Sequence, residues 1–300
     1  IANNFSSQSE RLVSAKPMDS LYKKWKEFLS APYKNEKRTV TIVGGGLGGI
    51  ELAFAVTEAL EKKQSLHQVT VIDRGKILKH ETSILRKKLT KLLLGKKIKI
   101  VENINILGLN DNRISLSNGT DIHSDFTIST AGAHPHSWIE KSGVPCKNGF
   151  IVVDCFLKSP KFPFLYAAGD CAHLDSTPRP KAGVFAVRAG PYLFHNIISS
   201  IENRRPRKFS PQRSHLKLIS IGNQKAVSSG RGFQLSGGVI WYWKNLIDMK
   251  FMESFSRLKP MNHRKDVELN PGEIQRQIIC GGCGSKVGQE LLNRVTSKIG

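Results

Sequence analysis

Hydrophobic and polar positions alternate with two different periods along the first half of the chain, and the two periods predict strands and helices in turn. An apolar, β-branched run over 39–43 predicts a buried strand, which a glycine-rich turn joins to a helical pattern over 47–63. The same order recurs as a strand over 68–75, a helix over 83–96 and further strands within 97–110. This alternation predicts a parallel α/β sheet.

Shorter patterns complete the predicted elements of this half. Residues 21–29 have helical spacing, and residues 111–133 predict a hairpin with its turn at 117–120, followed by a returning buried strand. Beyond this point, residues 162–173 predict an apolar strand that runs up to Gly169 and Asp170, and a helix is expected from about 183 to 201.

The last third of the chain predicts strands over 216–229 and 233–243 and an amphipathic helix from about 240 to 258. Polar, basic linkers are expected at 202–214 and 262–273. One side of the amphipathic helix carries Ile240, Trp243, Ile247, Phe251, Phe255 and Leu258. An apolar face with basic residues elsewhere suits contact with a membrane surface, a dimer or the core of the protein.

Composition narrows the class of protein. A length of 300 residues predicts about two domains, and 46 basic against 24 acidic residues give a net charge of +22, which attracts anions. No basic run is interleaved with aromatic residues, so nucleic acid is not an expected partner. Five scattered cysteines and the lack of a signal-peptide pattern favour a reducing, cytoplasmic compartment.

Gly44, Gly46 and Gly49 form a GxGxxG motif between the first long strand and its helix. In this context the motif predicts that a dinucleotide binds with its diphosphate against the start of the helix. Asp73 follows the next strand, 24 residues after Gly49, where a carboxylate binds ribose hydroxyls. Asp73 favours NADH, because the 2′-phosphate of NADPH would meet a like charge, although Arg74 keeps NADPH as an alternative.

A second candidate site is formed by Gly169 and Asp170, where the carboxylate can accept hydrogen bonds from polyol hydroxyls. Together with residues 15–25 and 129–138, this motif resembles the pyridine nucleotide-dependent flavoproteins, and in particular the type II NADH dehydrogenase branch. The resemblance implies FAD as cofactor, with Gly132, Gly169 and Asp170 on the flavin side. It also implies that Glu51 approaches the nicotinamide, although a carboxylate that stabilises the helix dipole explains this residue equally well.

The resemblance implies a doubly wound, three-layer fold with two dinucleotide-binding domains and a small α+β C-terminal region. Members of this family bind the FAD adenylate with a GxGxxG motif that this chain lacks before Gly44, so an internal fragment is expected. The expected division is 1–36, the tail of a first FAD-domain segment; 37–133, the NAD(P)H-binding domain; 134–205, a second FAD-domain segment; 206–262, an interface region; and 263–300, a linker and the start of a further domain.

The end of the chain carries the glycine- and cysteine-rich motif of residues 280–292. It resembles the start of selenide, water dikinase, in a fusion of that enzyme with an NADH dehydrogenase-like flavoprotein. The resemblance makes Cys283 the reactive cysteine and Lys286 the essential lysine, with ATP and Mg²⁺ bound by a body beyond Gly300. Cys280 and Cys283 also form a CxxC, but no second metal-binding pair follows, and no metal site is predicted.

The sequence thus predicts an FAD-dependent NAD(P)H oxidoreductase joined to a truncated dikinase. The expected electron acceptor is a quinone or another small molecule such as an oxidised selenium species. Peripheral contact with the inner face of a membrane through 240–258 and a homodimer are the expected alternatives for association. The competing hypothesis is a non-enzymatic NAD(P)H-binding redox sensor that regulates the attached kinase.

Overall fold

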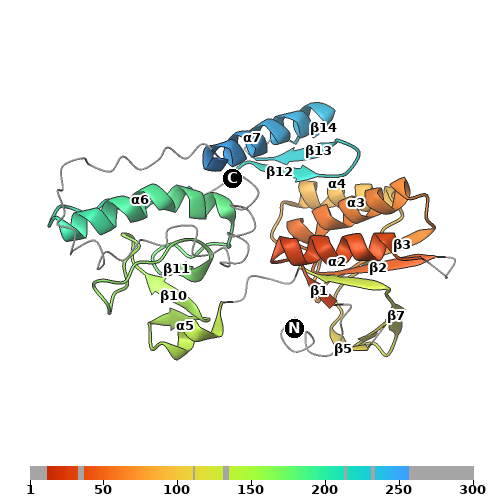
Figure 1. Ribbon diagram of the computed structural model, residues 1–300, viewed down its shortest axis with the longest axis horizontal. Coiled ribbons are helices and arrows are strands. Elements are labelled where there is room, and N and C mark those ends of the chain that lie inside the picture. Colours follow the sequence, from red (N-terminus) through yellow and green to blue (C-terminus); the bar gives the residue numbers. More distant parts are fainter. Residues whose placement is uncertain are drawn as a thin grey trace, which may run out of the picture. The chain divides into compact units, whose positions relative to one another are not determined.

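The computed structural model confirms the α/β class with a parallel central sheet (Figure 1). It describes residues 12–32, 37–110, 112–130, 135–212, 215–230 and 234–256. The largest sheet has five parallel strands in the order β1-β8-β2-β3-β4. Its strands are β1 (Leu12–Ser14), β2 (Arg38–Val43), β3 (His67–Ile72), β4 (Lys99–Val101) and β8 (Phe126–Ser129).

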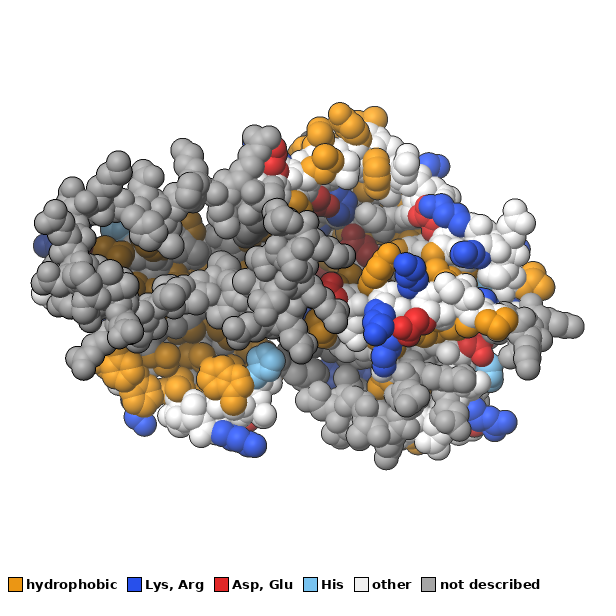
Figure 2. Space-filling model, in the orientation of Figure 1, with side chains coloured by type: hydrophobic (Ala, Val, Ile, Leu, Met, Phe, Trp, Pro, Cys, Tyr) orange, Lys and Arg blue, Asp and Glu red, His pale blue; other side chains and the backbone are white. Residues whose placement is uncertain are grey.

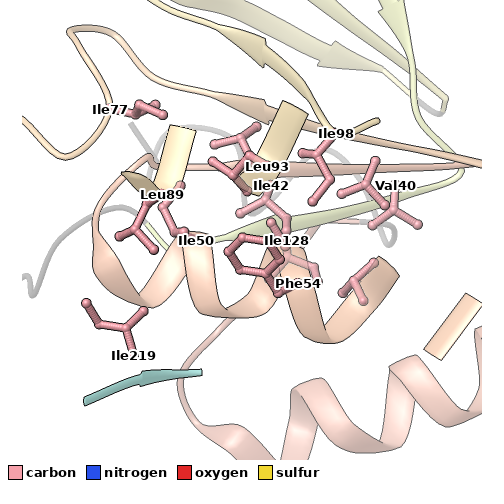
Figure 3. Packing of buried hydrophobic residues seen from close by; sticks show 14 of the residues in the cluster. Val40, Ile42, Ile50, Phe54, Ile77, Leu89, Leu93, Ile98, Ile128 and Ile219 are labelled. Atoms are coloured by element: carbon pink, nitrogen blue, oxygen red, sulfur yellow. The ribbon is translucent and has the colours of Figure 1, made fainter. Parts of the chain in front are cut away.

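Three helices, α2 (Met18–Ser30), α3 (Leu47–Lys62) and α4 (Ser83–Gly95), pack against this sheet through one hydrophobic core. Each presents an apolar stripe at helical spacing, which on α4 consists of the fully buried Leu85, Leu89 and Leu93. Figure 3 shows the helical side chains Ile50, Phe54 and Leu89 close to the strand residues Val40, Ile42 and Ile128. The predicted helical periods are confirmed.

A small antiparallel sheet belongs to a separate hydrophobic cluster. It consists of β5 (Ile106–Asn110), β6 (Arg113–Leu116) and β7 (Asp121–His123), so the predicted hairpin with its turn at 117–120 is confirmed. Its Leu109, Ile114 and Leu116 cluster with Ile72, whereas the preceding residue Val71 belongs to the core of the helices. Successive side chains of β3 therefore serve the two clusters, as the alternation of side chains along a strand requires.

Residues 12–30 share the sheet and core of β2. Strand β1 pairs in parallel with β8, and the aromatic rings of Trp25 and Phe28 on α2 contact Phe126 of β8. Arg38 ties α2 to β2, because its guanidinium donates to the carbonyls of Phe28 and Ala31 at 2.8 and 2.9 Å. These bonds satisfy carbonyl groups at the C-terminal end of α2, which have no partner within the helix.

The next part of the chain differs from the prediction in front of Gly169. Residues 161–168 do not form the predicted strand. Pro163 lacks an N–H group and lies in a turn, and Tyr166 makes only an isolated bridge with Lys158. The elements here are α5 (Ser137–Lys141), β9 (Cys146–Lys147), β10 (Phe150–Val153), a 3-10 turn (Gly169–Cys171), β11 (Ala172–Leu174) and α6 (Gly183–Ile201), the last with the predicted bounds.

The C-terminal region consists of β12 (Lys217–Ser220), β13 (Ala226–Ser229), β14 (Ser236–Gly237) and α7 (Gly238–Ser256). The strands predicted over 216–229 are confirmed. The strand predicted over 233–243 is wrong beyond Gly237, whose φ of 138° interrupts the extended backbone before the helix begins. Ile219 and Val227 of the β12–β13 hairpin join the core beside α3.

Helix α7 leaves many apolar side chains uncovered within the described structure. Ile240 is buried, but Trp243, Ile247 and Phe251 of the predicted apolar face remain 43 to 45% exposed. Figure 2 shows apolar side chains gathered over this region of the surface. Across the described ranges, every helix is too short or too polar to cross a membrane.

The site described below depends on one close approach between β2 and α3. Gly44, at the end of β2, has a φ of 116°, which favours glycine. A Cβ atom on Gly49 would lie 1.9 Å from the carbonyl oxygen of Gly44 and 2.9 Å from Oγ1 of Thr130. Gly49 therefore lets the first turn of α3 touch the end of the strand.

We expect Gly49→Ala to destabilise the chain by about 1–3 kcal/mol or more, because the new methyl group meets backbone that cannot move aside cheaply. The matched control is Gly48→Ala, where a Cβ meets nothing within 4 Å. The control should be neutral or stabilise by up to about 1 kcal/mol, since alanine favours helix. Denaturant midpoints of the two variants test this, and equal midpoints would contradict the packing described here.

Candidate functional site

The glycine-rich turn lies at the carboxyl end of the parallel sheet, where the order of the strands reverses. From β2 the chain passes through α3 to β3 on one side, whereas β8, the last strand to join, lies on the other side of β2. In open α/β sheets, ligands bind in the crevice at such a reversal point. Gly44, Gly46 and Gly49 therefore lie together where the motif predicts a ligand.

Gly46 is the residue of the turn that is open to a ligand. It is exposed, it is the N-cap of α3, and a Cβ atom at this position would meet nothing within 4 Å. As a glycine it has no side chain to accept hydrogen bonds from the first N–H groups of the helix. Those groups and the positive end of the helix dipole suit an anion such as a phosphate.

Two residues that the sequence did not single out also shape the turn. A Cβ on Gly45 would lie 2.4 Å from Cγ2 of Ile77, so this position is closed by the loop after β3. Thr130, at the end of β8, donates its N–H to the carbonyl of Val43 at 2.8 Å, and its Oγ1 lies 3.0 Å from the carbonyl oxygens of Val43 and Gly44. The run of three glycines was the one sequence signal for Gly45, and Thr130 had none.

Asp73 braces the turn from the next strand. Its Oδ2 accepts the N–H of Gly45 at 2.6 Å, and its Oδ1 accepts the N–H of Gly75 at 2.8 Å. A carboxylate has about four lone-pair positions, so both oxygens can accept a further hydrogen bond. The structure thus brings Asp73 to the glycine turn as predicted, and its role toward ribose stays a prediction.

Glu51 contacts the C-terminal hairpin. Its Oε1 accepts the N–H of Ser220 at 2.9 Å. Burial raises the pKa of the Glu51 carboxyl above its ordinary value, while the Ser220 N–H and the nearby Lys244 act in the opposite direction and Asp248 adds to the rise. The predicted approach of Glu51 to a nicotinamide stays a prediction.

Two more carboxylates hold the same hairpin, and the sequence gave no signal for either. Glu58, two turns beyond Glu51 on α3, accepts the N–H of Asn223 at 2.9 Å and pairs with Lys62 at 2.6 Å. Lys62 and then the Asn223 N–H lower the pKa of the Glu58 carboxyl. Glu81 pairs with Lys217 at 2.7 Å, with side chains only 11 and 26% exposed. The hairpin is thus anchored beside the glycine turn.

A cavity lies beside Gly169 and Asp170, the second pair of predicted site residues, and its lining also includes His173, Arg179 and Lys181. Gly169 has a φ of 76°, and a Cβ there would lie 3.3 Å from Cβ of Ala186 on α6. The Oδ2 of Asp170 lies 3.7 Å from Nζ of Lys16.

Polar atoms in the lining of this cavity lack partners. Nε2 of His173 and Nε of Arg179 are buried and make no hydrogen bond within the described structure. Burial first, and then Lys147 and Lys181, lower the pKa of His173, which keeps this ring neutral at pH 7. Because unsatisfied buried polar atoms are costly, the cavity fits a ligand with hydrogen-bonding groups.

Several predicted residues lie outside the described structure. They are Gly132, at the predicted link between the domains, and Cys280, Cys283 and Lys286 of the C-terminal motif. Within the residues that are described, the acidic, cysteine and histidine side chains form no group of three or more that would suit a metal ion.

Comparison with known proteins identifies relatives of this chain. A family model described as "Pyridine nucleotide-disulphide oxidoreductase" matches residues 13–190. The chain is 28% identical over 176 residues to the internal alternative NAD(P)H-ubiquinone oxidoreductase A1 of Solanum tuberosum. The aligned region covers 53% of this chain and 35% of that relative. The chain is also 28% identical over 207 residues to ferroptosis suppressor protein 1 of Mus musculus. This aligned region covers 65% of this chain and 54% of that relative.

A solved structure supports the fold. NDH2 of Plasmodium falciparum in complex with NADH superposes with a TM-score of 0.70 at 15% identity, over 81% of this chain and 70% of that one. The chain spans between about a third and just over half of the length of the two curated relatives.

The opposite pKa shifts of Glu51 and Glu58 predict opposite effects of pH on stability. The pKa of Glu51 is raised in the folded state, so its contribution to stability falls as the pH rises from 4.5 through the pKa of the folded state. The pKa of Glu58 is lowered, so its contribution to stability is lost as the pH falls from 4.5 through the pKa of the folded state. Glu51→Gln should therefore stabilise the chain at pH 7, and Glu58→Gln should destabilise it, each by about 1 kcal/mol or less.

Denaturant unfolding between pH 3.5 and 8 checks this pair of variants, which serve as each other's control. Glu51→Gln keeps a carbonyl oxygen for the Ser220 N–H and should lose the decline of stability above pH 4.5. The same direction of change for both variants at pH 7 would contradict the two environments described for α3.

Proposed function

Because the chain belongs to the pyridine nucleotide-disulphide oxidoreductase family, we propose that it is part of an FAD-dependent NAD(P)H oxidoreductase. The observation that carries this proposal is the glycine turn at the reversal point of the sheet. There Gly46 is open to a phosphate and Gly49 is held against Gly44. In this role the N-terminus of α3 would bind the diphosphate of the dinucleotide, and Asp73 the adenosine ribose.

NADH is the proposed dinucleotide, since the carboxylate of Asp73 would oppose a 2′-phosphate. Arg74, next to Asp73 and exposed, keeps NADPH as the alternative. Glu51 would lie toward the nicotinamide end of the same crevice. The name of the Solanum tuberosum relative, an NAD(P)H-ubiquinone oxidoreductase, and the NADH complex of the Plasmodium falciparum structure support a nicotinamide dinucleotide.

The cavity at Gly169 and Asp170 is the proposed flavin side of the site, to which Gly132 would also belong. When bound, FAD supplies a ring that accepts the hydride of the reduced nicotinamide. Asp170 would accept hydrogen bonds from the hydroxyls of the cofactor, and the unpartnered Nε–H of Arg179 would donate one. The close neighbour Ala186 leaves little room for a side chain at Gly169.

A quinone is the proposed electron acceptor, supported by the same Solanum tuberosum relative. The exposed apolar side chains of α7 are consistent with peripheral contact of this helix with a membrane, where a quinone is reached. A second copy of the chain would cover the same surface in a dimer. An oxidised selenium species is the acceptor that the C-terminal resemblance suggests.

The proposed domain division keeps an NAD(P)H-binding domain over 37–133, a flavin segment over 134–205, an interface region over 206–262 and a further domain from 263. Residues 1–36 are proposed as the tail of the first flavin segment, although residues 12–30 pack on the core of the NAD(P)H-binding domain. The start of a selenide, water dikinase at 280–292 rests on its sequence motif alone. ATP and Mg²⁺ would bind only in the body of that enzyme.

Removal of the ribose-binding carboxylate tests the dinucleotide assignment. In the full-length protein, Asp73→Ala should raise the KM for NADH about tenfold, the effect of losing one charge-assisted hydrogen-bonding group. Flavin content, read from visible absorbance, should stay the same. Asp121→Ala is the control, because it removes an exposed carboxylate of β7 outside the glycine turn and should leave both quantities unchanged. Unchanged NADH kinetics in Asp73→Ala would contradict the assignment.

The same absorbance separates the enzyme from the redox-sensor alternative. Bleaching of a flavin band on addition of NADH supports the oxidoreductase, whereas a colourless full-length protein that binds NADH would replace it with the sensor.

A separate variant tests the C-terminal motif. Cys283→Ala should abolish selenide-dependent ATP consumption by the full-length protein, because the thiolate is the proposed nucleophile. NADH oxidation should continue, since the motif has no proposed part in that reaction. Selenophosphate formation by the variant at the parental rate would rule out the dikinase role of Cys283.

A further inference from the structure

Lys181 is a cation held inside the cavity beside Gly169 and Asp170. It is half-buried, its Nζ donates to the carbonyl oxygen of Ala172, and the same atom lies 4.1 Å from the centre of the Phe150 ring. A carbonyl group and an aromatic face thus fix the ammonium in one place. Most lysines on protein surfaces have no such restraint.

The surroundings of Lys181 are electropositive. Arg179 also lines the cavity, with its guanidinium over the ring of Phe185 and its Nη1 donating to the carbonyl of Gln212 at 2.6 Å. The N-terminus of α6 follows directly, and its N-cap, Ala182, has no polar side chain to offset the positive end of the helix dipole. Among the described residues of the lining, Asp170 is the one carboxylate.

The partial burial of Lys181 is unfavourable for its positive charge. Burial lowers the pKa of the Lys181 ammonium, and Asp170 and Cys171 offset that cost only in part. A ligand that brings a negative charge to this place would remove the remaining penalty. The lining is otherwise rich in apolar residues such as Leu157, Phe185 and Ala189, which suits a flat aromatic ring with one delocalised charge better than a doubly charged, strongly hydrated phosphate.

We propose that Lys181 stabilises the negative charge that the flavin ring acquires on reduction, and so raises the reduction potential of the cofactor. This inference rests on the proposed function. In the proposed reaction, a hydride would leave C4 of the dihydronicotinamide and form a bond to N5 of the flavin, and the nicotinamide would become a cation. Without a second proton, the two transferred electrons would leave one negative charge on the pyrimidine side of the flavin ring.

The oxidised ring is neutral, whereas the reduced ring would carry a negative charge. A cation beside the ring would therefore stabilise the reduced cofactor more than the oxidised cofactor. This difference separates a tuning role for Lys181 from simple binding of the cofactor. Removal of the charge should change the reduction potential of the flavin. It should also change the affinity for sulfite, because sulfite adds to N5 and leaves the ring with the same negative charge. Removal of a binding contact should change flavin content instead.

The test compares Lys181→Met and Lys181→Arg in the full-length protein, with Lys161→Met as a control for loss of one positive charge at an exposed lysine of the same segment. Lys181→Met should weaken sulfite binding about tenfold and lower the midpoint potential by the two-electron equivalent of about 30 mV. Flavin content should not change. Lys181→Arg and Lys161→Met should stay within about twofold of the parent in sulfite affinity.

Each other outcome overturns the proposal in a distinct way. An unchanged potential and sulfite affinity in Lys181→Met would show that the lysine serves packing alone. Loss of flavin from Lys181→Met with an unchanged potential in the remaining bound fraction would make it a cofactor-binding contact. A parent protein that is colourless and takes up no added FAD would overturn the proposed function together with this inference.

Discussion

The contact between the first turn of α3 and the end of β2 is the constraint on which the rest of the candidate site depends. With the carbonyl oxygen of Gly44 lying 1.9 Å from where a Cβ of Gly49 would be, the helix can start against the strand only if that residue is glycine. The contact directs the N-terminus of α3 at the crevice where the strand order reverses. It also determines which faces of α3 meet the sheet and which meet the C-terminal hairpin.

Helix α3 links the nucleotide crevice to the C-terminal region. Its first residues form the glycine turn, and its carboxylates Glu51 and Glu58 accept backbone N–H groups of the β12–β13 hairpin. Glu51 is also within the electrostatic reach of Lys244 on α7. A helix that is fixed at both places gives the crevice a stable wall, because its position does not depend on a single contact.

The electrostatics of the two candidate sites differ in a way that matches the proposed reaction. At the glycine turn, backbone N–H groups and the helix dipole meet an anion without any cationic side chain in the motif itself. In the cavity at Asp170, charged side chains are partly buried, and Lys181 bears an unfavourable burial that a negative charge would relieve. Fixed positive charge in a partly buried site favours a state in which negative charge develops.

Local sequence patterns were sufficient to predict many of the secondary-structure elements and the residues of the glycine turn. The apolar periods of 39–63 and 83–96, the glycine spacing and the carboxylate after β3 each depend on neighbours in the chain, and the structure brings Gly44, Gly46, Gly49 and Asp73 to one edge of the sheet. The segment before Gly169 was read wrongly because its apolar residues suit a strand, while Pro163 and the lack of a pairing partner prevent one. The segment after Gly237 was read wrongly because a short apolar run suits both strand and helix.

The sequence by itself thus determined the α/β class, the position of the dinucleotide motif and the order of the elements from β2 to β8, since all of these follow from periodicity and spacing along the chain. Only the tertiary structure decided which carboxylates serve the C-terminal hairpin, that Thr130 closes the turn, and that Lys181 lies in a cavity with Asp170. Most of those relations form through backbone N–H and carbonyl groups, which nearly every residue carries and which therefore leave no mark in the amino-acid pattern.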